Sequence, residues 1–505
     1  MLVYSGSFRA EIEKDQVDST RVVMGIEPET FRWKLGSGDV FDTPEVILSF
    51  SGKGLARLSH HYHRVIREHI CRGKFKDQRR PVLLNSWEGL YFNFNEERIF
   101  ELAEGAKDLG VELLVLDDGW FGKRDNDLSG LGDWYVNEQK IRGGLPPLVQ
   151  KINDLGLKFG IWVEPEMVNE DSDLYRAHPD WAMQIPGRGP CRSRNQLVLN
   201  MSKPEVRDYI FETISRVLNS ANIEYVKWDV NRNVTDLFNE QYPADQQGEI
   251  SHRHILGVYE LLERFVTAFP DILFEGCSGG GGRFDAAMMY YYPQIWCSDD
   301  TDAIPRLEIQ HGTSFGYPVS TMGAHVSASP NHQTGRITPI QTRAVAAMHG
   351  TFGYELDPAK LTDREKELVR RQIRYFIEHY DVIQYGNYYR LSQLGASYYE
   401  AWEMVTRNQE EALVSVVITD VQPNSQLIHV KLKGLDRQAQ YRMEVYADLD
   451  ERMRNIPDFP GSAQLKAFLD QEGKTYSGAA LMNGGVTLPW IMGNYPAVQL
   501  YFQKV

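Results

Sequence analysis

Apolar and polar residues between positions 81 and 391 follow two alternating patterns. Short apolar runs rich in β-branched and aromatic residues are typical of buried strands, and stretches with apolar residues at helical spacing separate them. We predict strands at 82–87, 113–118, 159–164, 197–199, 225–229, 272–275 and 295–299, with a further one near 320–322. We predict helices at 96–109, 148–155, 204–218 and 252–269.

This alternation predicts parallel strands joined by crossover helices. About eight strand–helix units in roughly 300 residues fit a closed (β/α)8 barrel better than an open sheet. An open, doubly wound sheet is the alternative, but it would be expected to carry a nucleotide-binding fingerprint near its first strand. The sequence has no such fingerprint there, so we favour an α/β fold of the (β/α)8 TIM barrel type.

Both ends of the chain have β-type patterns instead. Before residue 52 we predict short strands, among them 31–35 and 46–50, and then an amphipathic connecting helix over 55–70. After residue 395 the helical spacing disappears, and an antiparallel β-sandwich is predicted from strand-like runs at 413–418, 428–432, 441–445 and 497–502. The predicted parts are a partial N-terminal β region with the connecting helix (1–75), the barrel (76–395) and the C-terminal sandwich (396–505).

Composition and charge exclude several classes of function. A net charge of −15 argues against a nucleic-acid partner, whose binding needs a basic stripe. The first residues have neither the basic region nor the apolar core of a secretory signal, and no window approaches the roughly 20 apolar residues needed to span a bilayer. Four scattered cysteines lack the paired spacing of a zinc site or a disulfide framework. We therefore expect a soluble, cytoplasmic protein with no membrane partner.

Polar residues at the carboxyl ends of the predicted strands are the candidates for chemistry, because catalytic groups of (β/α)8 barrels lie there. They are Trp87, Glu88, Asp117, Asp118, Trp120, Trp162, Lys227, Asp229, Cys277, Asp299 and Asp300. Aromatic rings stack on the apolar face of a sugar ring, while carboxylates and cations hold its hydroxyl groups. The mixture is typical of a sugar-binding pocket, although barrel tryptophans can equally be core residues. We assign Trp228, on the face of its strand opposite Asp229, to the core.

The strongest candidate is the segment 227–232. Alternation along the strand places Lys227, Asp229 and Asn231 on one face, and a structural salt bridge is the plain alternative. Asp229 and Asp299 lie two strands apart and could face each other across the barrel mouth. Glycoside hydrolysis needs such a pair, one carboxylate to attack or to activate water and the other to protonate the leaving oxygen.

Two further features are weaker candidates for ligand binding. The glycine-rich segment 277–283 resembles a phosphate-binding loop but lacks the Lys-Ser/Thr ending of a Walker A motif, so we predict that its glycines let backbone approach a ligand closely. The adjacent Asp117 and Asp118 fit either a metal site or a clamp for hydroxyl groups. The histidines are dispersed, and those at 60–63 lie on the connecting helix, which favours the clamp and predicts no metal site.

Together these residues resemble glycoside hydrolase family 36, the bacterial α-galactosidases. The matching motifs run in family order through the whole predicted barrel, at 85–88, 116–122, 162–167, 227–232, 277–285 and 298–302. The resemblance implies a retaining α-galactosidase, without metal or organic cofactor, that acts on raffinose-family oligosaccharides such as melibiose, raffinose and stachyose. It also suggests a homo-oligomer.

The resemblance maps the nucleophile to Asp229 and the general acid/base to Asp299. It implies that the galactose pocket is formed by Asp117, Asp118, Trp162, Arg194, Lys227, Asn231, Cys277 and Gly280. A retaining mechanism predicts carboxyl groups about 5–5.5 Å apart and a raised pKa for the proton donor. Lys227, two residues from Asp229, would favour the ionised form of that carboxylate.

Three neighbouring carboxylates compete for the role of proton donor. Alternation puts Asp299 and Asp300 on opposite faces, so one of the two points into the barrel mouth. Asp302 lies where the next helix is predicted to begin and suits a capping role. The family motif also selects Asp299.

The chain departs from the family pattern at its N-terminal end. Members of this type usually carry a large N-terminal β-supersandwich, and here we recognise its last strands, which would leave sheet edges and apolar faces uncovered. Three related functions stay open. The first is a transglycosylase similar to the raffinose synthases, and the second is a sugar-binding protein with a silent catalytic pair. The third is an α-N-acetylgalactosaminidase, because the loop around Cys277 decides the room beside the 2-position of the sugar.

Overall fold

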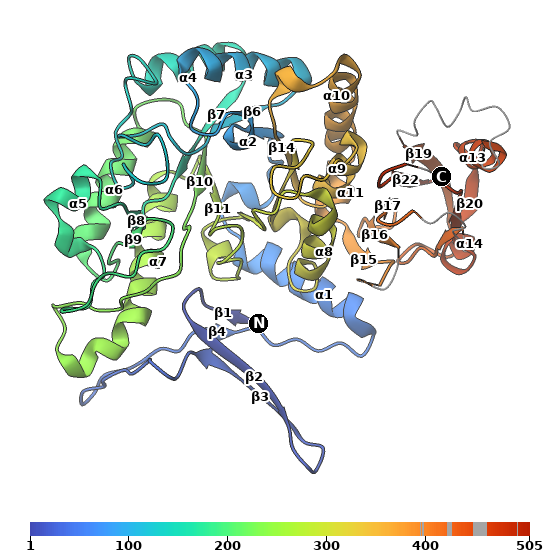
Figure 1. The fold of residues 1–505 in the computed structure, drawn as a ribbon. Coiled ribbons are helices and arrows are strands. Elements are labelled where there is room, and N and C mark those ends of the chain that lie inside the picture. Colours follow the sequence, from blue (N-terminus) through green and yellow to red (C-terminus); the bar gives the residue numbers. More distant parts are fainter. Residues whose placement is uncertain (394, 396–397, 422–426, 448–461, 492) are drawn as a thin grey trace.

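The computed structural model describes residues 1–505 except 394, 396–397, 422–426, 448–461 and 492. Its centre is a closed barrel of eight parallel strands, which confirms the predicted (β/α)8 fold and excludes the open sheet (Figure 1). In order around the barrel the strands are β5 (Leu83–Asn85), β6 (Leu113–Leu116), β7 (Lys158–Val163), β10 (Tyr225–Trp228), β11 (Leu273–Gly276), β12 (Gln294–Trp296), β13 (Met322–Ser327) and β14 (Thr351–Glu355).

Helices surround these strands. They are α2 (Trp87–Leu90), α3 (Glu96–Leu109), α4 (Leu145–Asp154), α5 (Asp173–Ala177), α6 (Pro204–Leu218), α7 (Ile250–Ala268), α8 (Ala303–Thr313), α9 (Ile340–Ala347), α10 (Asp363–Glu378) and α11 (Tyr380–Tyr385). Short 3-10 segments lie at Lys74–Lys76, Pro179–Trp181, Ala244–Glu249, Met288–Tyr290, Val319–Thr321 and Pro358–Lys360. Helix α3 shows why the sequence folds this way: Asn95 caps its first turn, Gly110 ends it with a left-handed φ of 92°, and its apolar positions are buried against the barrel.

One predicted barrel strand is wrong and another was missed. Residues 197–199 do not enter the barrel, because β9 (Leu197–Val198) pairs antiparallel with β8 (Met167–Val168) in the loop region before α6. Both positions are buried in that loop, and periodicity cannot distinguish such a run from a barrel strand. The eighth strand is β14, whose Gly353 packs so closely on β5 and β13 that a Cβ would lie 3.0 Å from the Leu83 carbonyl oxygen. The strand predicted near 320–322 is also displaced, because β13 begins at Met322 and runs to Ser327.

The N-terminal region differs from the prediction in detail. Strand β1 (Leu2–Val3) pairs with β4 (Glu45–Val46), and β2 (Phe8–Lys14) pairs with β3 (Thr20–Ile26) in a hairpin that projects away from the barrel (Figure 1). Residues 31–35, predicted as a strand, form irregular chain whose backbone bonds to the 3-10 segment Ala244–Glu249 before α7, and most of 46–50 is irregular as well. The predicted connecting helix is confirmed as α1 (Gly54–Val65), continued by a π-helical turn at Ile66–Ile70.

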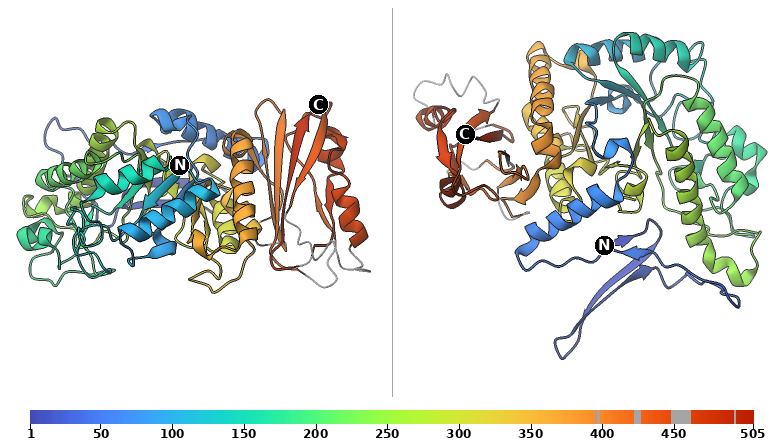
Figure 2. Two further views of the ribbon diagram at one scale, coloured as in Figure 1. Left: turned by 90° about the horizontal axis from the view of Figure 1, so that it is seen from above. Right: turned by 180° about the vertical axis from the view of Figure 1, so that it is seen from behind.

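The C-terminal region is the predicted antiparallel structure. Its main sheet contains β15 (Asn387–Arg390), β16 (Tyr399–Val405), β17 (Glu411–Ile418), β22 (Ala497–Lys504), β19 (Gln440–Tyr446) and β20 (Thr475–Ser477), in that order. A smaller sheet of β18 (Ile428–Val430) and β21 (Val486–Leu488) shares one apolar core with it, beside α13 (Ser462–Leu469) and α14 (Gly478–Asn483). The main sheet stands against one flank of the barrel, where β17 and β22 pack on α9 (Figure 2).

Within the described part of the chain, no helix combines the length and the apolar character needed to cross a membrane.

Candidate active site

The inner face of the barrel changes from apolar to polar along β6 and β10. At the amino ends, one buried cluster fills the barrel interior: Leu83, Leu113, Val115, Tyr225 and Leu273. Inward positions lie two residues apart, so Val115 is followed by Asp117, and Tyr225 by Lys227 and Asp229. This alternation brings carboxylates and a lysine to the carboxyl ends of the strands.

These polar side chains surround a cavity of about 210 Å³. Eight of the predicted site residues line it: Asp117, Asp118, Trp162, Arg194, Lys227, Asp229, Asn231 and Asp299. Arg194 and Asp299 are exposed, Asn231 is half-buried, and the other five are buried. The cavity thus collects residues that are more than 180 positions apart in the chain, between Asp117 and Asp299.

Four N–H groups hold the carboxylate of Asp229. The Trp162 indole N–H donates to Oδ2 over 3.3 Å, and the Asn231 amide donates to the same oxygen over 2.8 Å. The backbone N–H groups of Val230 and Gly279 donate to Oδ1 over 2.8 and 3.2 Å. Both oxygens are therefore fixed in direction, and the carboxylate has one orientation toward the cavity.

Lys227 contacts Asp117 rather than Asp229. Its Nζ lies 3.1 Å from Asp117 Oδ2, which also accepts from the Asn85 amide over 2.7 Å. Burial disfavours the lysine's charge, but Asp117, Glu355 and other nearby negative groups outweigh burial and raise the pKa of Lys227 well above its usual value. A permanent ammonium group therefore lies beside Asp117 at the floor of the cavity.

Asp118 forms a buried ion pair that the sequence pattern did not reveal. The Arg124 guanidinium donates to both Asp118 oxygens, with its nearest nitrogen 2.8 Å from Oδ2, and Arg124 is 1% exposed. Burial raises the pKa of Asp118, while Arg124 opposes that effect. Arg124 follows in the loop after β6, where neither strand nor helix periodicity signals a partner.

The three candidate proton donors take different positions. Asp299 lines the cavity, and its Oδ1 accepts from the Trp296 indole over 3.0 Å. Asp300 accepts from the Asp302 backbone N–H, and Asp302 caps α8 by accepting from the Ile304 N–H. Asp299 is open to the cavity but enclosed by surrounding protein, and this desolvation, followed by the nearby charge of Asp229, raises the pKa of Asp299. Such an environment suits a carboxyl group that must be protonated before the reaction.

Three further carboxyl groups line the cavity: the half-buried Asp127 and the buried Glu88 and Glu355. Burial and the neighbouring Glu355 raise the pKa of Glu88 to about 8, although Glu88 accepts from Thr301 and lies 3.3 Å from a ring nitrogen of His332. For Glu355, burial is outweighed by a hydrogen bond from His325 and by Lys227, which lower its pKa. Glu88 stood among the strand-end candidates without a role, and Glu355 was missed because it ends the strand that the pattern did not reveal.

A third buried carboxyl group lies behind the cavity. Glu164 accepts from the Asn231 backbone N–H and from the Gln196 amide, and burial together with the charge of Asp229 raises its pKa to about 8. The folded protein thus holds a proton here that the unfolded chain releases near its ordinary pKa of 4.5. The contribution of Glu164 to stability must therefore fall as the pH rises from about 4.5 to about 8.

We expect Glu164→Gln to reduce the fall in stability with rising pH, because glutamine resembles the protonated side chain. The amide fits, since Gln196 Oε1 is buried without a partner among the described residues and can accept from it after an amide flip. Thermal unfolding of both proteins, measured between pH 5 and pH 9, should show a smaller fall in melting temperature for the variant. Parallel pH curves for the two proteins would contradict the prediction.

Cys277 and Gly280 lie behind the cavity wall. The Cys277 backbone N–H donates to the Trp228 carbonyl oxygen, and burial raises the pKa of the Cys277 thiol well above its usual range. Gly280 has a φ of 79°, and a Cβ there would lie 2.1 Å from the Asp299 backbone nitrogen. The glycine-rich loop therefore presses against the chain that carries Asp299, and at this position glycine is required for packing between two backbones.

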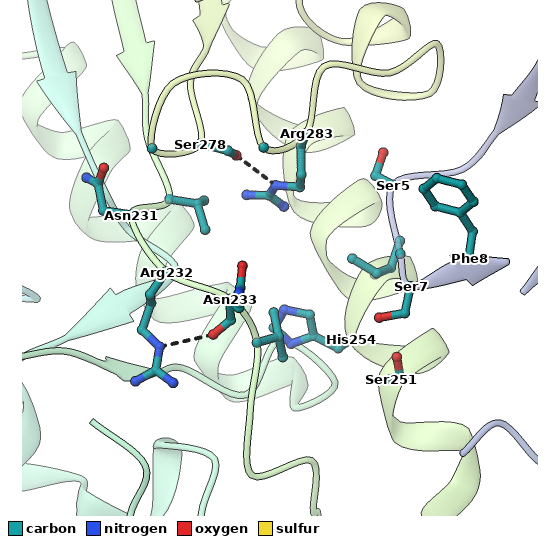
Figure 3. A pocket seen from close by; sticks show the side chains of 16 residues that line it. Ser5, Ser7, Phe8, Asn231, Arg232, Asn233, Ser251, His254, Ser278 and Arg283 are labelled. Atoms are coloured by element: carbon teal, nitrogen blue, oxygen red, sulfur yellow. Dashed lines mark hydrogen bonds between the residues drawn. The ribbon is translucent and has the colours of Figure 1, made fainter. Parts of the chain in front are cut away.

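A larger cavity of about 670 Å³ adjoins the site at Asn231 (Figure 3). It lies between residues 5–8, the start of α7 and the loops after β10 and β11. Its two guanidinium groups are already bonded: Arg232 donates to the Asn233 carbonyl oxygen, and Arg283 donates to Ser278 and to Glu166. We assign the chemistry to the smaller cavity, because Asp229 and Asp299 both line it.

Sequence comparisons show which families and proteins the chain resembles. The family described as "Melibiase" matches residues 40–386, and the N-terminal and C-terminal domains of glycosyl hydrolase family 36 match residues 1–36 and 399–502. The bifunctional α-galactosidase/sucrose kinase AgaSK of Mediterraneibacter gnavus is 50% identical over 100% of this chain and 50% of its own length. The α-galactosidase AgaA of Geobacillus stearothermophilus is 50% identical over 88% of this chain and 61% of its own length. The chain thus spans about half to three-fifths of these relatives.

Solved structures give the same result. The crystal structure of AgaA superimposes with a TM-score of 0.93 at 46% identity, over 100% of this chain and 66% of that one. Variants of AgaA solved in complex with raffinose and with stachyose also have TM-scores of 0.93, at 45% and 46% identity.

Proposed function

The chain belongs to the melibiase family and carries sequence of the flanking domains of glycosyl hydrolase family 36, and from this premise we propose that it is an α-galactosidase. It removes terminal α-linked galactose from raffinose-family oligosaccharides, a substrate class supported by the raffinose and stachyose complexes of AgaA. The observation that carries the proposal is a cavity lined by Asp229 and Asp299, neither of which forms an ion pair among the described residues, beside the charged cluster of Asp117, Asp118 and Lys227.

In this proposal Asp229 is the nucleophile. Its carboxylate attacks the anomeric carbon while Asp299 protonates the glycosidic oxygen, so the bond to the leaving sugar breaks and a galactosyl ester forms on Asp229. Asp299, now ionised, removes a proton from water, which attacks the same carbon and releases Asp229. Two displacements retain the anomeric configuration. The raised pKa of Asp299 supports the role of acid in the first step.

The remaining residues bind and orient the sugar. We infer that Asp117 and Asp118 accept hydrogen bonds from galactose hydroxyl groups, with Lys227 and Arg194 as donors and Trp162 as an apolar surface. Cys277 and Gly280 act from behind the wall, by shaping the loop whose Gly279 N–H bonds Asp229. This reaction requires no metal or organic cofactor.

Hydrolysis of p-nitrophenyl α-galactoside, with and without excess sucrose, tests the function. We expect release of p-nitrophenol and free galactose in both cases. Formation of raffinose in place of galactose would identify a transglycosylase. If the p-nitrophenyl glycoside of α-N-acetylgalactosamine, assayed in parallel, were the better substrate, the protein would be an α-N-acetylgalactosaminidase. Galactose binding without release of p-nitrophenol would identify a silent sugar-binding protein.

We expect Asp117→Asn to weaken galactose binding by roughly 1–3 kcal/mol, the contribution of a hydrogen bond to a charged group. The variant removes the negative charge that Lys227 and Asn85 orient toward the cavity. Isothermal titration with galactose measures the effect, and Asp125→Asn, at an exposed carboxylate that pairs with Lys140 outside the cavity, is the matched control. Activity that is lost in EDTA and restored by a divalent cation would instead show that the aspartates hold a metal.

A further inference from the structure

The carboxylate of Asp299 is held by one side chain. The Trp296 indole N–H donates to its Oδ1 over 3.0 Å, and within the described residues this is the hydrogen bond that the carboxylate accepts. Trp296 ends β12, points into the barrel and is 2% exposed. Asp299 lies three residues further, in irregular chain that has no strand ladder to fix it. The indole is therefore the group that sets the direction of this carboxyl.

The ring of Trp296 is itself fixed on several sides. The Arg306 guanidinium lies 4.4 Å from the ring centre, and the His325 ring packs against it with centres 4.4 Å apart. The ammonium of Lys227 lies 5.6 Å from the ring centre. His325 is in turn bonded to Glu355 over 3.1 Å. Because these neighbours come from α8, β13 and β10, the indole cannot turn without displacing three elements of the barrel.

We propose that Trp296 is a positioning residue for Asp299, whose Oδ1 it occupies so that Oδ2 carries the proton to the leaving oxygen. This inference rests on the proposed function. In the first displacement the proton leaves Oδ2 for the glycosidic oxygen, the bond from that oxygen to the anomeric carbon breaks, and Asp229 bonds to the carbon. Asp299 then carries a negative charge, and the Trp296 N–H bonds more strongly to that charge than to the neutral acid.

The same hydrogen bond acts on the acidity of Asp299. Burial and Asp229 raise the pKa of Asp299, as does Glu355, whereas Lys227 and the Trp296 N–H lower it. The neutral thiol of Cys277 also lies near it, on β11's continuation. Loss of the N–H removes one stabilising contact of the carboxylate while every other neighbour stays, so the pKa of Asp299 must rise.

The experiment compares Trp296→Phe with the wild type on melibiose and on an aryl α-galactoside with a good leaving group. We expect kcat/KM for melibiose to fall roughly 10–100-fold, as for a lost hydrogen bond to a charged group. The aryl substrate should lose much less, because it needs little protonation. The alkaline limb of the pH profile for melibiose should move to higher pH, while the acid limb stays in place. The comparison requires that the wild-type protein hydrolyses both substrates. If it hydrolyses neither, the proposed function is refuted, and not the role of Trp296.

Trp228→Phe is the matched control. It removes an indole N–H that donates to the carboxylate of Glu166 over 2.9 Å, on the outer face of β10. Any loss of activity in this variant should be equal for the two substrates, with both limbs unmoved. If Trp296→Phe folds poorly, replacement of Trp296 by 3-benzothienyl-alanine keeps the bicyclic shape and removes the N–H alone. The proposal would be overturned if that protein behaved like the wild type. It would also be overturned if that protein lost equal activity on both substrates with the alkaline limb unmoved.

Discussion

Asp229→Ala is expected to lower α-galactoside hydrolysis by roughly 10³-fold or more, the scale of loss when one member of a cooperating catalytic unit is removed. The reason is geometric. Four N–H groups aim the carboxylate at the cavity, and alanine leaves them with nothing to bind and no atom to attack the sugar. Initial rates on p-nitrophenyl α-galactoside measure the effect, and circular dichroism and galactose binding show whether the fold and the pocket persist.

Azide distinguishes a lost nucleophile from a damaged pocket. In Asp229→Ala, azide can enter the space of the missing carboxylate and attack from the same face, so the product should be β-galactosyl azide. Turnover of the activated substrate should rise with azide concentration. Near wild-type activity in the variant without azide would show that Asp229 is not the nucleophile.

The second large effect concerns the proton donor. Asp299→Ala should lower kcat/KM on raffinose by roughly 10²–10⁴-fold, the usual contribution of general acid catalysis. An activated aryl galactoside should be affected far less in its first step, since its leaving group departs without a proton. Added azide should attack the galactosyl ester from the opposite face and give α-galactosyl azide.

Asp300→Ala is the matched control for this experiment. Asp300 is adjacent in sequence, but its carboxylate accepts from the Asp302 backbone N–H. We expect at most a moderate loss, of equal size for raffinose and the aryl substrate. A strong dependence on the leaving group in Asp300→Ala alone would move the acid role to that residue.

The polar ends of the barrel strands were predictable because strand alternation is a local property. Tyr225, Lys227 and Asp229 share a face by their spacing alone, and the structure places that face inside the barrel. The same rule separated Asp299 from Asp300 and left Trp228 in the core, where its indole bonds Glu166. Position along one strand therefore sufficed for Lys227 and Asp229, whereas Arg194, which lies in a loop, was assigned from the family resemblance.

The partners of those residues were not predictable, since they depend on which loops meet in space. Lys227 was expected to act on Asp229 but contacts Asp117, which is 110 positions away. Arg124 lies in a loop without periodicity. Glu355 ends β14, where Gly353 interrupts the apolar run by which a strand is recognised in the sequence. A run such as 197–199 has the composition of a barrel strand, yet Leu197 and Val198 pair antiparallel with Met167 and Val168 outside the barrel. Local pattern cannot contain such information.

The glycine-rich loop after β11 touches both acids at once: the Gly279 N–H bonds Asp229, and the Gly280 backbone abuts that of Asp299. The spacing of the two reacting groups is thus set by the main chain of one loop, which bonds to the Asp229 carboxylate and packs against the Asp299 backbone. Changes in the loops that meet the leaving sugar can then alter which oligosaccharides are accepted without changing the distance between Asp229 and Asp299. A side chain added at Gly280 would have the opposite effect. It would force Asp229 and Asp299 apart, although every residue that touches the sugar would keep its identity.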